Sequence, residues 1–417
     1  MFGSLRSKLN SGTVKTVRLD KSAAQIPTGC FFVTEDTLRR VFEAIGTYFR
    51  ESDIFLLVTC LASAIFGLVL ISSATRVYNS NSFLTVQTAA IVLGVILYII
   101  VSLIDIDIIA DKHKLLFVVG ALFISTLYIW GVRGDTGNQA WLRFFGVGIQ
   151  PAEVVKILFI IILAQMISTK RDTRSLNSAR SIFSIIGVFL TYFVLIWTSS
   201  SDLGSALVYV FILVVMLFVG GVGLKWFALG IGAIAVALPL VWQFILSEKQ
   251  KLRVMVYFRP ELAEAEALDT MWQANQSKQA ISSGGFIGKG LFQGKMTQSV
   301  MIPQQHTDFI FSAAGEELGF VGCLAIVLLL VIIIARCLYV GVKSNNTLGL
   351  LVCSGVAASF IFQTLENLGM CLGLTPVIGL TLPFFSYGGT SIITSFLMMG
   401  LIAGVKMRPK LTHSRNF

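Results

Sequence analysis

Long apolar runs alternate with polar segments along most of the chain. A hydrocarbon core about 30 Å thick is crossed by a helix of about 20 apolar residues. Runs of this kind predict about ten membrane-spanning helices, at residues 54–73, 83–104, 114–131, 152–168, 181–198, 203–221, 226–246, 318–340, 347–371 and 388–405. The pattern therefore predicts an all-α polytopic membrane protein whose transmembrane domain covers residues 54–408.

Lysine and arginine residues indicate which side of the membrane each polar segment occupies. Cytoplasmic loops carry an excess of these cations. With ten spans, the cations at residues 112–114, 170–180, 225 and 336–343 fall on the same side as both termini, which predicts that residues 1–53 are a cytoplasmic arm and residues 409–417 a cytoplasmic tail. An amphipathic pattern at residues 37–49 favours a surface-lying or partly disordered arm over a binding module.

Three polar segments then lie outside the cytoplasm. They are residues 131–150, 247–308 and 373–389, and the first of them carries Arg143 in an aromatic, basic stretch. The segment 247–308, between the seventh and eighth spans, is long for a simple connection. Loops of that length more often carry function.

The composition agrees with a membrane protein. Hydrophobic residues make up 55% of the chain and charged residues 13%, and the mean hydropathy is +0.82. Soluble domains carry about 25% charged residues. The net charge of +10 follows from the cytoplasmic segments and does not indicate a nucleic-acid partner. The six cysteines form no CxxC pair and are typical of helix packing.

Ionisable side chains near the membrane-spanning segments fall at one depth. Such residues are costly inside a bilayer and are candidate functional positions. In this topology all of them lie in the outer half: Glu153, Lys156, Asp202, Glu316, Glu317 and Glu366. Singly they could snorkel to water, and the i, i+3 spacing of Glu153 and Lys156 allows a simple pair. Together they predict an outward-facing polar cavity above apolar helix surface, suited to a ligand with a charged head and a hydrophobic tail.

Asp308 lies directly before the eighth span. Either Asp308 or Thr307 could serve as a helix N-cap. Alternatively, Asp308 is a general base at the mouth of the cavity. Gly315 is seven residues further on and falls in line with Asp308 on a helix, where a glycine would leave room beside the carboxylate.

A glycine-rich stretch at residues 284–294 has some features of a phosphate-binding loop. It departs from that motif because Gly290, and not Ser or Thr, follows Lys289. A weaker interpretation stays open, in which backbone amides with Lys289 and Lys295 hold phosphate oxygens.

Four segments resemble a known family. They are NQAWLRFFGVGIQPAEVVK (138–156), IPQQHTDFIFSAAGEELGFVG (302–322), ENLGMCLGLTPVIG (366–379) and LTLPFFSYGGTS (380–391). In this order, on the expected sides of a ten-span chain, they resemble the shape, elongation, division and sporulation (SEDS) proteins of bacteria, the RodA, FtsW and SpoVE group. Two departures stand out: Ala152 where the family often has Ser, and Ser200-Ser201 before Asp202 where it often has Gln-Pro.

The resemblance implies a peptidoglycan glycosyltransferase of the bacterial cytoplasmic membrane. Such proteins polymerise lipid II, an undecaprenyl diphosphate-linked disaccharide-pentapeptide, and work with a class B penicillin-binding protein that crosslinks the strands. The family's essential aspartate corresponds to Asp308, and its QPxExxK segment places Glu153 and Lys156 at the site.

This resemblance implies a mechanism at an extracytoplasmic active site. Asp308 takes the proton of an acceptor hydroxyl, and cations or a divalent ion, Mg or Mn, hold the leaving diphosphate. No nucleotide cofactor is needed, and the ligands of any metal are unknown. Besides Asp308, the candidate substrate-binding residues are Lys156, Glu153, Arg143, Lys289, Asp202, Glu316, Glu366 and His306. Two alternatives stay open, a flippase for lipid-linked precursors and a non-catalytic scaffold of an elongation or division complex.

Overall fold

The computed structural model describes residues 46, 50–78, 80–132, 139–144, 147–244, 251, 255, 265–344 and 346–408. The chain divides into two compact units, Met1–Tyr48 and Phe49–Phe417, and every element with described bounds belongs to the second. Nearly all of the predicted amphipathic segment 37–49, and all of the tail 409–417, lie outside the described residues. The cytoplasmic placement of both termini stays a prediction.

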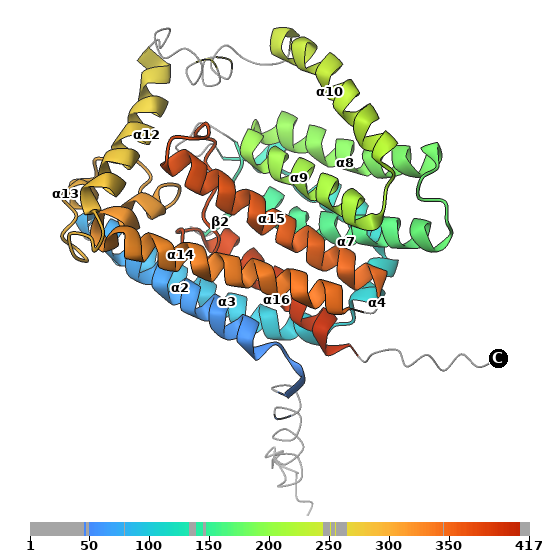
Figure 1. Cartoon of the computed structure of the whole chain (residues 1–417), viewed down its shortest axis with the longest axis horizontal. Coiled ribbons are helices and arrows are strands. Elements are labelled where there is room, and N and C mark those ends of the chain that lie inside the picture. Colours follow the sequence, from blue (N-terminus) through green and yellow to red (C-terminus); the bar gives the residue numbers. More distant parts are fainter. Residues whose placement is uncertain are drawn as a thin grey trace, which may run out of the picture. The chain divides into compact units, whose positions relative to one another are not determined.

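The described part contains ten helices long and apolar enough to cross a membrane (Figure 1). They are α2 (Ile54–Ala74), α3 (Ser82–Leu103), α5 (His113–Ser125) with α6 (Leu127–Trp130), α7 (Pro151–Asp172), α8 (Ala179–Ser200), α9 (Leu203–Gly220), α10 (Leu224–Phe244), α14 (Ile310–Lys343), α15 (Thr347–Cys371) and α16 (Gly389–Met407). The all-α polytopic fold is confirmed. Shorter elements are η1 (Arg76–Tyr78), α4 (Ile106–Asp111), the antiparallel strands β1 (Leu142–Phe144) and β2 (Val147–Ile149), α12 (Ala265–Gly284) and α13 (Lys295–Gln298).

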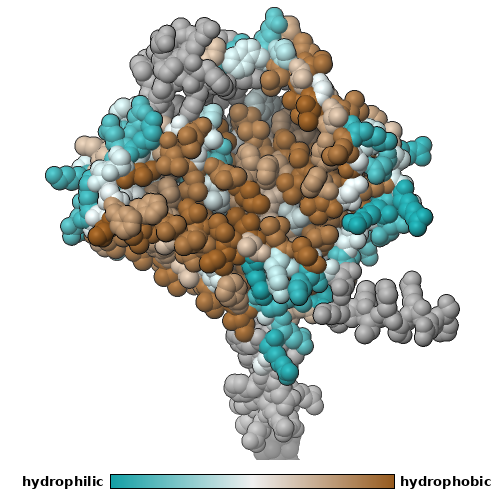
Figure 2. Space-filling model, viewed as in Figure 1, coloured by the Kyte–Doolittle hydropathy of each residue, from teal (hydrophilic) through white to brown (hydrophobic). Residues whose placement is uncertain are grey.

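Apolar side chains cover much of the surface of the second unit. Figure 2 shows hydrophobic residues gathered over the middle of the visible face, with hydrophilic residues toward its edges. The exposed hydrophobic residues of α14 include Leu324, Leu328 and Val331. Such a surface would be unfavourable in water and is typical of helices that face lipid.

The eighth span is longer than the predicted residues 318–340. α14 begins at Ile310, and its backbone breaks at Gly319, where φ is 67° and ψ is −160°. A side chain at Gly319 would lie only 2.3 Å from the backbone nitrogen of Gly288. The apolar pattern missed the first turns because they carry Glu316 and Glu317, whose burial depends on tertiary contacts.

The glycine-rich stretch replaces the hydrogen bonds that the break removes. Two amides of α14 donate to carbonyls of the stretch, Phe320 to Gly285 at 3.0 Å and Val321 to Phe286 at 3.2 Å. Two amides of the stretch donate to carbonyls of α14, Lys289 to Glu316 at 3.1 Å and Gly290 to Glu317 at 2.9 Å. An unpaired backbone group away from water costs several kcal/mol. The break therefore depends on this stretch.

Close packing of α3 and α16 uses glycine. Gly400 and Gly404 form a GxxxG pair on α16 that faces the backbone of α3. A Cβ at Gly400 would lie 2.8 Å from the Tyr98 carbonyl oxygen, and one at Gly404 would lie 3.2 Å from that of Ser102. Small residues of this spacing let membrane helices approach closely.

We expect Gly400→Val to lower the melting temperature of the detergent-solubilised protein, because the new side chain overlaps the α3 backbone. Overpacking of this kind costs about 1–3 kcal/mol. Gly187→Val on α8 is the matched control, since nothing lies within 4 Å of the added Cβ there. Equal melting temperatures for the two variants, measured by tryptophan fluorescence, would contradict this packing.

Candidate active site

The turn before α14, residues 304–309, is fixed by other parts of the chain. The His306 carbonyl accepts a hydrogen bond from the Tyr387 amide at 2.8 Å. The next carbonyl, of Thr307, accepts one from the Ser386 hydroxyl at 2.5 Å. Both donors belong to the segment just before α16, so these hydrogen bonds join the turn to that segment.

Asn367, on α15, donates a hydrogen bond to the next carbonyl of the turn, that of Asp308. Its Nδ2 atom donates to the Asp308 carbonyl at 2.8 Å and to the Leu380 carbonyl at 2.7 Å. The side chain has no exposed surface. One amide group thus joins the Asp308 backbone to the segment before α16. Sequence reasoning missed Asn367 because it counted only ionisable residues within the spans.

The Asp308 carboxylate is half-buried. Its Oδ2 atom lies beside Gly379, where an added Cβ would be 3.3 Å away. The pKa of Asp308 is raised to about 6, chiefly by burial and to a smaller extent by the Asp202 carboxylate, while a Thr307 hydrogen bond opposes the rise. The α14 N-cap is Phe309, and no side chain caps the helix there. The capping role considered for Asp308 and Thr307 is therefore wrong.

Asp202 is the N-cap of α9 and is 8% exposed. It accepts hydrogen bonds from the Ser205 amide at 3.1 Å and hydroxyl at 2.7 Å, and from Gln150 Nε2 at 3.1 Å. These donors hold the carboxylate in place, where its charge favours the protonated form of Asp308.

Glu153 and Lys156 form a buried ion pair. Lys156 Nζ lies 2.7 Å from Glu153 Oε2, and the two residues are 1% and 6% exposed, so neither snorkels to water. Glu153 also accepts from Gln363 at 3.3 Å and from Thr394 at 3.4 Å. Gln363 lies four residues before Asn367 on α15, on the same helix face. Polar side chains therefore lead from this ion pair toward the Asp308 backbone.

Glu316 and Glu317 hold the glycine-rich stretch against α14. Glu316 is fully buried and pairs with Lys289 at 2.8 Å, and it also accepts from the amide and hydroxyl of Thr297, both at 2.8 Å. Glu317 accepts from the Ser73 hydroxyl on α2 at 2.6 Å. The amides of residues 289 and 290 are already bonded to α14.

Gly315 has a different role from the one expected. A Cβ there would lie 2.9 Å from Ile281, so the glycine lets α12 pack on α14. A Cβ at Gly284 of α12 would in turn lie 1.9 Å from the Gly315 carbonyl. The expectation that Gly315 makes room beside Asp308 is therefore wrong.

The remaining predicted residues have different settings. Arg143 is exposed on β1. His306 packs among aromatic rings, with the Phe83 ring centre 5.1 Å from its own. Glu366 is half-buried on α15, and its Oε1 atom is buried with no hydrogen-bond partner among the described residues.

Comparison with known proteins identifies the family. Residues 53–411 match the family of cell cycle proteins that comprises FtsW, RodA and SpoVE. The chain belongs to this family. It is 32% identical to the probable peptidoglycan glycosyltransferase FtsW of Trichlorobacter lovleyi over 371 residues. This alignment covers 86% of this chain and 95% of that relative. It is 27% identical to the peptidoglycan glycosyltransferase MrdB of Escherichia coli over 361 residues. This alignment covers 86% of this chain and 94% of that relative.

Solved structures of SEDS proteins share the fold. A chain of a peptidoglycan synthase complex that coordinates polymerization and crosslinking superposes with a TM-score of 0.72 at 28% identity, over 85% of this chain and 97% of that chain. The rod shape determining protein RodA of Thermus thermophilus gives a TM-score of 0.62 at 26% identity, over 85% and 96%. These matches extend the resemblance to the whole described helical part.

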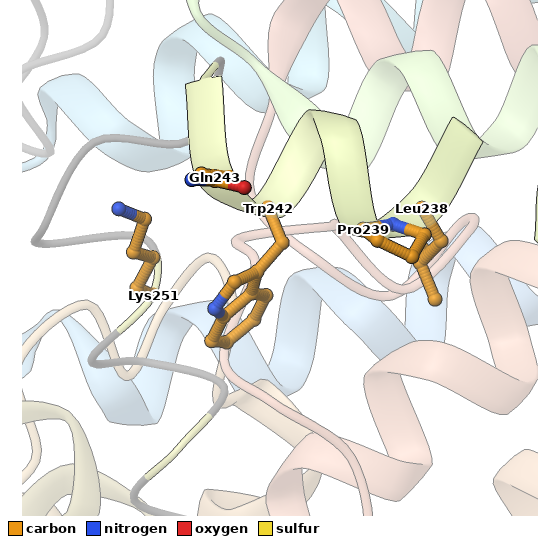
Figure 3. A pocket seen from close by; sticks show the side chains of 5 residues that line it. All are labelled: Leu238, Pro239, Trp242, Gln243 and Lys251. Atoms are coloured by element: carbon orange, nitrogen blue, oxygen red, sulfur yellow. The ribbon is translucent and has the colours of Figure 1, made fainter. Parts of the chain in front are cut away.

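Two further features of this SEDS protein bear on ligands. The described residues contain no group of three or more His, Cys, Asp or Glu placed to hold a metal ion. A pocket of about 530 Å³ lies against α10, lined by Leu238, Pro239, Trp242, Gln243 and Lys251 (Figure 3). None of the candidate site residues lines it.

We expect Glu316→Ala to expose the glycine-rich stretch, because Lys289 and the amides of Met296 and Thr297 lose their acceptor. Limited trypsin digestion should then cleave faster after Lys289 and Lys295. Glu51→Ala is the control, since Glu51 is exposed and distant in sequence. Digestion of Glu316→Ala at the wild-type rate would show that these contacts do not hold the stretch.

Proposed function

We propose that the protein polymerises lipid II at the outer face of the membrane, with Asp308 as the general base. This multi-pass protein of the bacterial inner membrane is a peptidoglycan glycosyltransferase, as its family and its named relatives indicate. The observation that carries the assignment of the base is the setting of Asp308, a half-buried carboxylate on a backbone held from two sides, with a pKa of about 6.

The proposed step is a displacement at the anomeric carbon. A sugar hydroxyl of the acceptor loses its proton to the Asp308 carboxylate while its oxygen bonds to the anomeric carbon of the donor. The bond from that carbon to the diphosphate breaks, and undecaprenyl diphosphate leaves with the electron pair. A base with a pKa near the working pH is both largely ionised and basic enough to accept the proton. A fixed backbone keeps the carboxylate aligned during the step.

Cations near the site stabilise the leaving diphosphate in this proposal. Lys156 and Lys289 are each paired with a glutamate at 2.7 and 2.8 Å. Those pairs reduce the charge that either lysine offers to a phosphate. Arg143, exposed on β1, is therefore our first candidate to contact the diphosphate, and the two lysines act through the structures that they support.

The proposed partner is a class B penicillin-binding protein. The structural relative belongs to a peptidoglycan synthase complex that coordinates polymerization and crosslinking. Polymerised strands need crosslinking to form a wall, so a membrane polymerase of this fold is suited to act beside a crosslinking enzyme. We also propose that the turn carrying Asp308 faces the extracytoplasmic side, because the ten-span topology places it opposite the cation-bearing loops at residues 170–180 and 336–343.

We expect Asp308→Asn to fold and insert normally and to lose lipid II polymerisation by about 10²–10⁴-fold, the usual contribution of a general base. The amide keeps the size of the side chain but cannot accept the proton. The assay uses purified protein and fluorescent lipid II, with Asp172→Asn, an exposed aspartate at the end of α7, as control. If Asp308→Asn made as much polymer as the wild-type protein, Asp308 would not be the general base. If the wild-type protein scrambled lipids in vesicles but made no polymer, the protein would instead be a flippase.

The pH dependence of the rate gives a second test. Asp308 must be ionised to accept a proton, and its pKa is raised to about 6. The rate should therefore be constant well above pH 6 and fall about tenfold per pH unit below it. Asp202→Asn removes a charge that raises this pKa, so the midpoint should move to lower pH. A profile that is flat from about pH 5 to 7 would contradict the assignment.

A further inference from the structure

Four aromatic rings from three separate segments meet beside the Asp308 turn. We define them as the outer aromatic cluster: Tyr78 in η1, Phe83 in α3, His306 and Tyr387. Ring centres are 5.6 Å apart for Tyr78 and Phe83, 5.1 Å for Phe83 and His306, 5.2 Å for Phe83 and Tyr387, and 5.7 Å for His306 and Tyr387. Most of these pairs are edge-on or tilted, the arrangements that aromatic rings prefer.

The cluster is partly open to the outside of the protein. Tyr78 is 43% exposed, and the other three residues are half-buried. A cluster that served only as core would exclude solvent from all its rings. Here all four rings keep some exposed surface, and Tyr78 is the most exposed of them.

The cluster is also attached to the Asp308 backbone. The Tyr387 amide donates to the His306 carbonyl at 2.8 Å, and the neighbouring Ser386 hydroxyl donates to the Thr307 carbonyl at 2.5 Å. His306 lies two residues before Asp308. Two of the four rings, those of His306 and Tyr387, therefore belong to segments that are hydrogen-bonded to each other beside Asp308.

The chemistry of such a surface suits a sugar. A pyranose ring has a face of C–H groups that stacks on an aromatic ring and an edge of hydroxyls that bond to polar tips. Tyrosine offers both kinds of contact. Arg76, in the same short helix as Tyr78 and 5.3 Å from the centre of the Phe292 ring, adds a positive charge nearby.

We propose that the outer aromatic cluster is a stacking site for a pyranose ring of the glycan that reacts at Asp308. The proposal rests on the proposed function, because it takes the glycan as the substrate of Asp308. It assigns the binding of the sugar to Tyr78 and Phe83, leaving proton transfer to Asp308. The competing explanation is that Tyr78 belongs to the belt of aromatic residues that anchors membrane proteins at the lipid headgroups.

The test is direct binding of the soluble disaccharide N-acetylglucosaminyl-N-acetylmuramic acid to purified protein carrying Asp308→Asn. Saturation-transfer NMR and a titration in nanodiscs measure the dissociation constant. We expect Tyr78→Leu and Phe83→Leu each to raise the dissociation constant at least tenfold with unchanged melting temperature. Tyr78→Trp, which keeps an aromatic ring, should bind the disaccharide as tightly as the protein with Tyr78. Tyr128→Leu is the control, since Tyr128 is a similarly exposed tyrosine, 51%, at the end of another span.

Unchanged affinity in both leucine variants, or equal losses in Tyr128→Leu, would overturn the proposal. So would a fall in melting temperature that accompanies every loss of binding, because the rings would then act only as packing. Since binding is measured without turnover, its outcome is independent of whether Asp308 is the base. In the otherwise wild-type enzyme, Tyr78→Leu should raise the KM for lipid II about tenfold or more and leave kcat nearly unchanged.

Discussion

Three consecutive peptide carbonyls, those of residues 306, 307 and 308, each accept a hydrogen bond from a donor elsewhere in the chain. The rest of the site depends on this arrangement. A turn at the end of a helix would otherwise have several carbonyls without partners, which costs free energy away from water. These donors hold the backbone at Asp308, and a Thr307 hydrogen bond contacts its carboxylate.

Most of the acidic groups that the sequence predicts for the outer half have a structural role. Glu316 and Glu317 hold the glycine-rich stretch across the break at Gly319, and Glu153 neutralises Lys156 inside the helix bundle. Removing one partner from such a pair leaves an uncompensated buried charge, which is strongly destabilising. Asp308 differs from Glu153 and Glu316, since no ion pair is found for it among the described residues and its pKa is raised to about 6.

The number and approximate bounds of the spans could be predicted from apolar run length, because the bilayer sets that length. The pairing of Glu153 with Lys156 followed from their spacing. The break in α14 could not be predicted, since it depends on a backbone contact with Gly288, 31 residues earlier. Asn367 and Ser386 escaped notice because neutral polar residues in apolar segments give no charge signal, and their partners are backbone atoms distant in sequence.

The most direct test of the central claim is an experimental structure of the Asp308→Asn protein with two lipid II molecules bound. The account predicts that a hydroxyl of the acceptor sugar lies about 3 Å from the side chain of residue 308, within hydrogen-bond reach of a base. It also predicts that the donor's anomeric carbon faces that hydroxyl. A side chain at this position that contacts the diphosphate, or that points away from both glycans, would contradict the account.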